Sequence, residues 1–366
     1  MRGRVLNVLR ASYQGLSEEC RGDGGLTVVE VLTGGSERYA LEAYDACKPK
    51  AFALVAGPSR NALAAALEAA AALPKAGVFF VKSAEEREEA FKVLTRLDKF
   101  FGARIALVGQ KAPWLVAPGY TEEDLRNIFD AKIESIKKSL IVEKFEEVKD
   151  DEVKDLVESI GVGATKVEVS REDLVKAAKL HVALSETLKG YKALSISCFE
   201  LMKDVAVTPC LSVALLNSAN VPTACEGDTN SLLAQVLSYA ARGRVGGIFN
   251  LDYLDAKLVA FAHCTAPLTL LDRYDLTYHY ETGLPLAIRG YVSKGKEITS
   301  IRLSKLGHEL LEGLTVEGEE LDACRTQIWA ELEGEPSLIG NHRVVVDGRI
   351  KRVLSQLIRS LGLHKV

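Results

Sequence analysis

The chain has 366 residues, of which 48% are hydrophobic and 26% are charged, and its formal net charge is −4. This length predicts two or more domains, and the near-average composition excludes a disordered or fibrous protein. The slightly acidic balance lacks the basic field that neutralises phosphates, so we expect no nucleic-acid partner.

No segment of the sequence predicts membrane insertion or export. The longest apolar stretch, residues 62–73, contains Glu68 and is shorter than the roughly 20 residues that a spanning helix needs. Residues 1–9 lack the apolar core and cleavage site of a signal peptide. We therefore expect a cytoplasmic protein with no membrane partner.

The seven cysteines are an odd number and contain no CxxC pair. This spacing argues against a disulfide framework and against structural zinc. We expect buried thiols, because free cysteine behaves as a small hydrophobic residue.

The first part of the chain alternates strand and helix patterns. Strands are predicted at residues 51–56, 77–81 and 104–108, and helices at 61–73 and 84–101. Such alternation is typical of a parallel α/β sheet. We predict an N-terminal α/β domain of the Rossmann-like kind over residues 1–150, which ends near the charged stretch 142–157.

A second α/β series follows over residues 151–265. Helices are predicted at 171–189 and 230–241, and strands at 193–198, 221–225, 245–249 and 258–262. From residue 266 to residue 366 the apolar period changes to two, which predicts an antiparallel β subdomain. Its strands are predicted at 286–292, 297–303, 323–332 and 343–346, and a closing helix at 350–361.

Three short strands in the middle of the chain are each followed by a residue that can bind a metal: Glu226, Asp252 and His263. If these strands are parallel neighbours, their carboxyl ends bring the three side chains into one crevice. Each residue has a plainer interpretation when taken alone. An acid after a strand often caps a helix, as Asp228 can, and a histidine in an apolar strand is often a hydrogen-bonded core residue.

Carboxylates combined with imidazoles form an oxygen-rich site that suits Mn²⁺ or Mg²⁺ better than a thiolate site does. His342, next to Gly340 and Asn341 at a turn, is a further candidate ligand. His279 and Glu281 lie two residues apart on one side of an extended segment, so both can face the same site. A solvent-facing polar strand is the alternative for this pair.

Five segments resemble the L-fucose isomerase family, in the same order along the chain. They are TPCLSVALLNSANVPTACEGD (208–228), FNLD (249–252), AHCT (262–265), ACRTQ (323–327) and GNHR (340–343). The resemblance covers roughly the C-terminal half, and the segment around His279 is similar to that of short archaeal-type relatives. Fucose isomerases are longer in their N-terminal part, and their usual HCG is HCT here.

The resemblance implies a divalent ion, usually Mn²⁺ and otherwise Mg²⁺ or Co²⁺, bound by Glu226, Asp252 and His342, with no organic cofactor. Glu226 and Asp252 are the implied catalytic carboxylates. His263, His279, Glu281, Asn341 and Arg325 are weaker candidates for contact with the substrate. The implied reaction is aldose–ketose isomerisation of an open-chain sugar through an enediol, in a homo-oligomer that is a trimer or hexamer.

Two other functions stay open from the sequence. One fold hosts several chemistries, so a metal-dependent epimerase or lyase for a sugar derivative is an alternative, and so is a non-catalytic sugar-binding protein. The Glu- and Lys-rich helices with few Asn and Gln indicate a thermophilic source.

Overall fold

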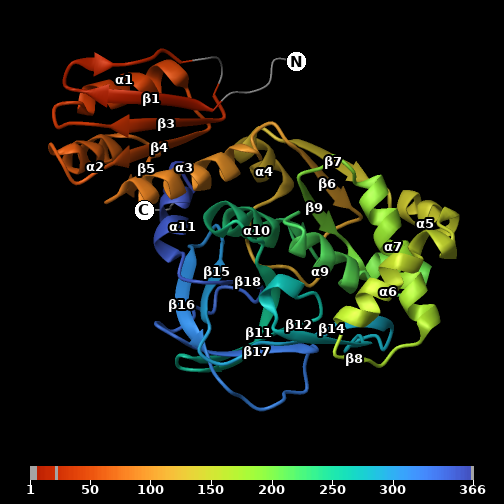
Figure 1. The fold of residues 1–366 in the computed structure, drawn as a ribbon. Coiled ribbons are helices and arrows are strands. Elements are labelled where there is room, and N and C mark those ends of the chain that lie inside the picture. The colour runs from red at the N-terminus through yellow and green to blue at the C-terminus, as the bar shows by residue number, and fades with distance from the viewer. Residues whose placement is uncertain (1–5, 21–23, 364–366) are drawn as a thin grey trace.

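The computed structural model describes residues 6–20 and 24–363. Residues 1–5, the start of the segment considered above as a signal peptide, lie outside the described part. The chain forms parallel α/β sheets followed by a separate antiparallel barrel, which confirms the predicted fold class (Figure 1). No helix within the described residues is both long enough and apolar enough to cross a membrane.

The N-terminal unit is a five-stranded sheet in the order β2-β1-β3-β4-β5, parallel except for the short edge strand β2. The predicted strand at 51–56 is β4, all six residues of which are buried, because helices cover both faces of a parallel sheet. The elements are β1 (Asn7–Ser12), β2 (Gly15–Leu16), β3 (Leu26–Val31), α1 (Glu37–Cys47), β4 (Ala51–Ala56), α2 (Ala62–Ala72), β5 (Gly77–Phe80) and α3 (Ala84–Asp98).

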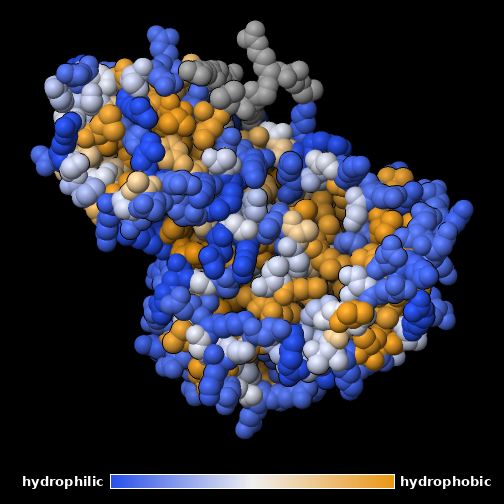
Figure 2. Space-filling view, in the orientation of Figure 1, coloured by the Kyte–Doolittle hydropathy of each residue, from blue (hydrophilic) through white to orange (hydrophobic). Residues whose placement is uncertain are grey.

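A second parallel sheet has the order β10-β9-β6-β7 and so joins strands from before and after residue 150. The charged stretch 142–157 forms α5, η1 and the start of α6, and hydrophilic side chains predominate at the right-hand edge of Figure 2, where α5 lies. The elements are β6 (Arg104–Val108), α4 (Glu122–Phe129), β7 (Lys132–Ile136), α5 (Lys138–Glu147), η1 (Asp150–Val153), α6 (Lys154–Gly163), α7 (Arg171–Thr187), β9 (Ala193–Ile196), α8 (Cys198–Val205), α9 (Cys210–Ser218), β10 (Thr223–Ala224) and α10 (Thr229–Arg242).

The third unit is a closed barrel in the order β11-β12-β17-β16-β15-β18. Its strands are β11 (Gly247–Asp255), β12 (Leu258–His263), β15 (Glu297–Arg302), β16 (Glu309–Thr315), β17 (Thr326–Leu332) and β18 (Arg343–Asp347). Beside the barrel, β13 (Arg273–Tyr278) pairs with β14 (Pro285–Tyr291) and with β8 (Lys166–Val167).

The expectation that residues 221–225, 245–249 and 258–262 form neighbouring parallel strands is wrong. Only β10 belongs to a parallel sheet, while β11 and β12 are an antiparallel pair in the barrel. β11 runs on to Asp255 and is followed by only two residues before β12 begins. A parallel connection needs a crossover of a dozen or more residues, so this short link can only make a hairpin.

The closing helix α11 (Lys351–Ser360) returns from the barrel to the N-terminal sheet (Figure 1). Gln356 Oε1 accepts a hydrogen bond of 2.8 Å from the backbone N of Val78 in β5. Leu354 and Leu357 of its apolar stripe join the same core cluster as Leu94 of α3. The last helix of the chain is therefore packed against the N-terminal unit.

The prediction that the chain has no disulfides is wrong for four cysteines. Cys20 is bonded to Cys47, and Cys198 to Cys225. The members of each pair are 27 residues apart in sequence, and tertiary packing brings them together without any short motif. Cys210, Cys264 and Cys324 are buried free thiols, as expected.

Candidate metal centre

Glu226 lies in the short loop between β10 and α10, in the left-handed backbone region with φ of 62°. The following Gly227 has φ of 68°, and a Cβ there would lie 2.6 Å from both Gln110 O and Lys111 Cα. The backbone N of Ala112 donates to Glu226 O at 2.8 Å. Positive φ is uncommon for a residue with a side chain, and such strain is found at functional sites when surrounding contacts hold it in place.

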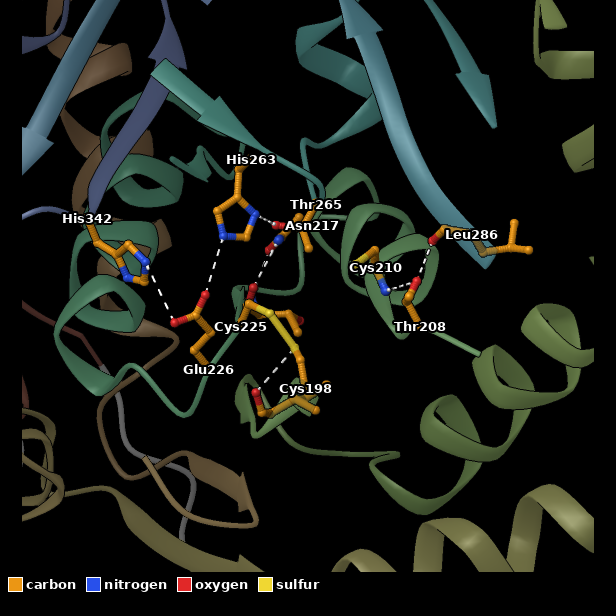
Figure 3. Close-up of a disulfide and its surroundings, with 12 residues drawn as sticks. Cys198, Thr208, Cys210, Asn217, Cys225, Glu226, His263, Thr265, Leu286 and His342 are labelled. Carbon is orange, nitrogen blue, oxygen red and sulfur yellow. Dashed lines mark hydrogen bonds and ion pairs between the residues drawn. A yellow bond between two sulfur atoms is a disulfide. The ribbon is translucent and has the colours of Figure 1, made fainter. Parts of the chain in front are cut away.

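Three buried side chains, Glu226, His263 and His342, converge on one point (Figure 3). They are 8%, 5% and 4% exposed, and their ligand atoms all lie within 4.8 Å of one another. His263 Nε2 is 3.8 Å from Glu226 Oε1, and His342 Nε2 is 3.9 Å from Glu226 Oε2. Two atoms bound to one ion at about 2.1 Å are at most about 4.2 Å apart. Both histidine contacts with Glu226 are within this limit, and the three residues together could hold a metal ion.

Each imidazole is oriented by a partner on its other ring nitrogen. His342 Nδ1 is 2.8 Å from Asp228 Oδ2, and His263 Nδ1 is 2.9 Å from Thr265 Oγ1. Metal-binding histidines usually have such a partner, which fixes the tautomer and the ring orientation. Both Nε2 atoms are thereby directed at the carboxylate of Glu226.

The electrostatics of this group favour charged carboxylates. Burial alone raises the pKa of Glu226, but the interactions with His263 and His342 and the hydrogen bond from Trp114 outweigh it, so the pKa is lowered. Burial also opposes ionisation of Asp228, yet the contacts with His342 and Ser231 lower its pKa to about 2. Ionised carboxylates are the form that binds a cation.

Trp114 is a site residue that the sequence analysis missed. Its Nε1 donates to Glu226 Oε2 at 2.6 Å, and its ring packs against Phe199 with centroids 5.0 Å apart. Phe199 in turn contacts the ring of His279 at 5.9 Å. A tryptophan 112 residues before the carboxylate that it contacts carries no signal in the sequence.

Asp252 lies outside the group of three. β11 and β12 shift register between Leu251 and Tyr253, so Asp252 is the extra residue of a β-bulge and is exposed. Partial burial of its carboxyl raises its pKa, and the nearby charge of His263 opposes that change. Asp252 is therefore close enough to the group to interact with it electrostatically.

His279 and Glu281 follow β13 and also act on the group electrostatically. His279 is buried, and burial together with the charge of His263 lowers its pKa to about 4. Glu281 is exposed, and partial burial of its carboxyl and the charge of Glu226 raise its pKa. Both side chains therefore belong to the surroundings of the candidate metal-binding group. The sequence pattern left two possibilities for this pair, a shared site or a strand that faces solvent.

Asn341 and Arg325 have contacts with neighbouring strands and loops. Asn341 Nδ2 donates to Asn250 Oδ1 and its Oδ1 accepts from Leu251 N, each at 2.8 Å. Arg325 Nε donates to Tyr278 O at 2.9 Å. These bonds connect the segment before β18 to β11, and the residue before β17 to the end of β13.

A cavity of about 630 Å³ opens beside the group, between the parallel sheet and the barrel. Trp114, Asp228 and His342 all belong to its wall. This position, outside the carboxyl ends of β6, β7 and β9, is where open α/β sheets bind ligands. The volume is typical of small-molecule sites.

No protein-family model matches the sequence, and no curated protein matches it.

Proposed function

We propose that the chain is a metal-dependent aldose–ketose isomerase that acts on an open-chain sugar through an enediol. The observation that carries this proposal is the buried group of Glu226, His263 and His342 beside a cavity of about 630 Å³. The order of the segments that resemble the L-fucose isomerase family supports it further. By that resemblance the ion is Mn²⁺ and the protein is a homo-oligomer.

The chain's own residues divide into holding and orienting roles. Glu226, His263 and His342 would hold the ion. Asp228 and Thr265 fix the orientation of the two imidazoles. When bound, a divalent ion would polarise the oxygens on C1 and C2 and offset negative charge that develops on them.

Of the two implied catalytic carboxylates, Asp252 is the one outside the group of three, and so it is available for proton transfer. In the reaction the base takes the proton from C2, and the C–H electron pair forms the C1–C2 double bond as the carbonyl oxygen gains a proton. The same carboxyl then returns its proton to C1 while the hydroxyl on C2 loses its own, which yields the ketose. A raised pKa suits such a group, since general acid–base catalysis is most effective when the pKa is near the working pH.

The test is an assay of metal-stripped protein against aldoses, ketoses and phosphorylated sugars, with and without added Mn²⁺, in D₂O. Proton NMR would follow exchange at C2 and the formation of ketose. Mn²⁺-dependent exchange with ketose formation supports the isomerase. Exchange at C2 that yields only an epimer would indicate an epimerase. A product with fewer carbons would indicate a lyase. Metal and sugar binding without any exchange would favour a binding protein.

A further inference from the structure

Three residues on neighbouring strands of the parallel sheet line one side of the 630 Å³ cavity. Ser195 of β9 is the direct neighbour of Leu107 in β6, and Leu107 is the neighbour of Ser135 in β7. Residues opposite each other in a parallel sheet point to the same face, so these three side chains form one surface. All three line the cavity near the carboxyl ends of their strands.

Arg302, the last residue of β15, enters the cavity wall from the barrel. It is 5% exposed, and its guanidinium makes one hydrogen bond, from Nη1 to His342 O at 3.0 Å, while Nε has no partner among the described residues. No carboxylate of residues 6–20 and 24–363 forms an ion pair with it. A buried guanidinium that lacks a paired anion is costly, because its charge is removed from water without compensation.

The two acids whose charges act on Arg302, Asp228 and Glu309, both have other partners. Glu309 pairs with Arg343 at 3.1 Å. Asp228 Oδ1 accepts from the backbone N of Asn230 and of Ser231, each at 3.0 Å, and Oδ2 is bonded to Ser231 Oγ and His342 Nδ1. Asp228 therefore caps α10 and orients His342, and it leaves the guanidinium of Arg302 without a carboxylate.

Two further features of the same cavity suit negative charge. Ser195 is 1% exposed, and its Oγ has no hydrogen-bond partner among the described residues. Lys111 adds an exposed cation to the rim.

We infer that this cavity binds an oxyanion, the carboxylate or phosphate group of a sugar derivative, through Arg302 and Ser195, with Lys111 at the rim. The inference rests on the proposed function in one respect, that the anion is the acidic end of the substrate. Arg302 donates to the backbone of His342, so the anion site and the metal-binding group share one residue. A bound sugar acid or sugar phosphate would then direct its uncharged carbonyl end toward Glu226, His263 and His342.

The test is isothermal titration calorimetry on the full chain, stripped of metal and kept in EDTA. The probes are inorganic phosphate, ribose 5-phosphate, gluconate and neutral ribose. The variants are Arg302→Gln, Arg302→Lys and Ser195→Ala. Arg359→Gln is the matched control, because it removes the same charge from an exposed position away from this cavity.

Ribose 5-phosphate or gluconate should bind more tightly than ribose, and the tighter of the two tells whether the ligand is a phosphate or a carboxylate. Arg302→Gln should weaken that binding about tenfold to a hundredfold, Arg302→Lys and Ser195→Ala less, and Arg359→Gln not at all. Absence of binding by all three anionic probes would overturn the inference, and so would equal binding by the folded Arg302→Gln variant. If Arg302→Gln does not fold, unchanged binding in Ser195→Ala would overturn it.

This result is separable from the isomerase assignment. Binding is measured without metal and without turnover, so anion binding can be shown in a protein that isomerises no sugar. Conversely, Mn²⁺-dependent isomerisation of a neutral sugar by a protein that binds no anion would retain the proposed function and reject this inference.

Discussion

His342 Nδ1 lies 2.8 Å from Asp228 Oδ2, so the last candidate ligand along the chain is oriented by the residue that caps α10. A helix cap and a histidine from the barrel thereby form one unit. The carboxylate directs Nε2 of His342 at Glu226 and stabilises the imidazole in that position. The candidate metal-binding group is thus built across the boundary between the parallel sheet and the barrel.

Asp228→Asn tests this relationship. Asparagine is an equally good helix cap, so the fold should be kept, while the loss of charge weakens the orientation of His342. Affinity for Mn²⁺, measured by calorimetry, should fall about tenfold to a hundredfold. Asp347→Asn, which removes a carboxylate paired with Arg242 at 2.8 Å, serves as the control and should leave the affinity unchanged. Equal affinity in both variants would show that Asp228 acts only as a cap.

Glu226→Gln and Asp252→Asn should separate binding from catalysis. Glu226 belongs to the group of three, so its variant should lose bound Mn²⁺. Asp252 lies outside that group, so its variant should retain Mn²⁺ and lose about 10²-fold to 10⁴-fold in turnover of the substrate found by the NMR assay. Metal content by elemental analysis and rates by NMR give the two readouts. Loss of metal in Asp252→Asn would instead add this residue to the ligands.

Trp114 should report on the site by fluorescence. Its Nε1 donates to Glu226 Oε2 at 2.6 Å, so a paramagnetic ion such as Mn²⁺ bound by Glu226 would lie close to the indole and quench it. The chain has two tryptophans, and Trp329 bonds to Glu319 O in the barrel. Quenching by Mn²⁺ should persist in Trp329→Phe and disappear in Trp114→Phe. The reverse pattern would place the ion elsewhere.

His279 should make the protein less stable in acid. Its pKa is lowered from 6.5 to about 4 in the folded chain, mainly by burial. Between these values the unfolded chain binds a proton that the folded chain does not, so stability is full above pH 6.5 and falls as the pH drops toward 4. The whole effect is up to about 3 kcal/mol.

Urea unfolding at a series of pH values would measure this contribution. His279→Gln should flatten the curve in that window and leave some slope, because burial lowers the pKa of His181 as well. Identical pH profiles of the variant and the natural chain would contradict the assignment of the slope to His279.

Gly227→Ala should destabilise the protein because of the contacts of its added Cβ. The new atom would lie 2.6 Å from Gln110 O and Lys111 Cα, at a φ of 68°. Gly295→Ala is a matched control, since Gly295 also has a positive φ, of 82°, but no atom lies within 4 Å of its Cβ position. The first substitution should cost about 1 to 3 kcal/mol more than the second in thermal or urea unfolding. Equal costs would mean that the loop around Glu226 adapts freely.

Local patterns in the sequence were sufficient for several elements. The apolar run at residues 51–56 predicted the buried strand β4, and the apolar stripe from Val353 to Leu361 predicted α11. The period of two beyond residue 266 predicted the antiparallel strands, among them β14 and β18. These features are decided by neighbouring residues, because side-chain periodicity follows directly from local backbone geometry.

The sequence by itself determined the α/β class, several of the elements and the presence of Glu226, His263 and His342 as residues able to bind a metal. Only the tertiary structure decided that β11 and β12 are antiparallel, that Asp252 lies outside the group of three, and that Trp114 and Arg302 belong to the site. Periodicity records which face of a strand is buried but not which strand lies beside it. Contacts between distant segments depend on how whole sheets pack, and that information is spread over the entire chain.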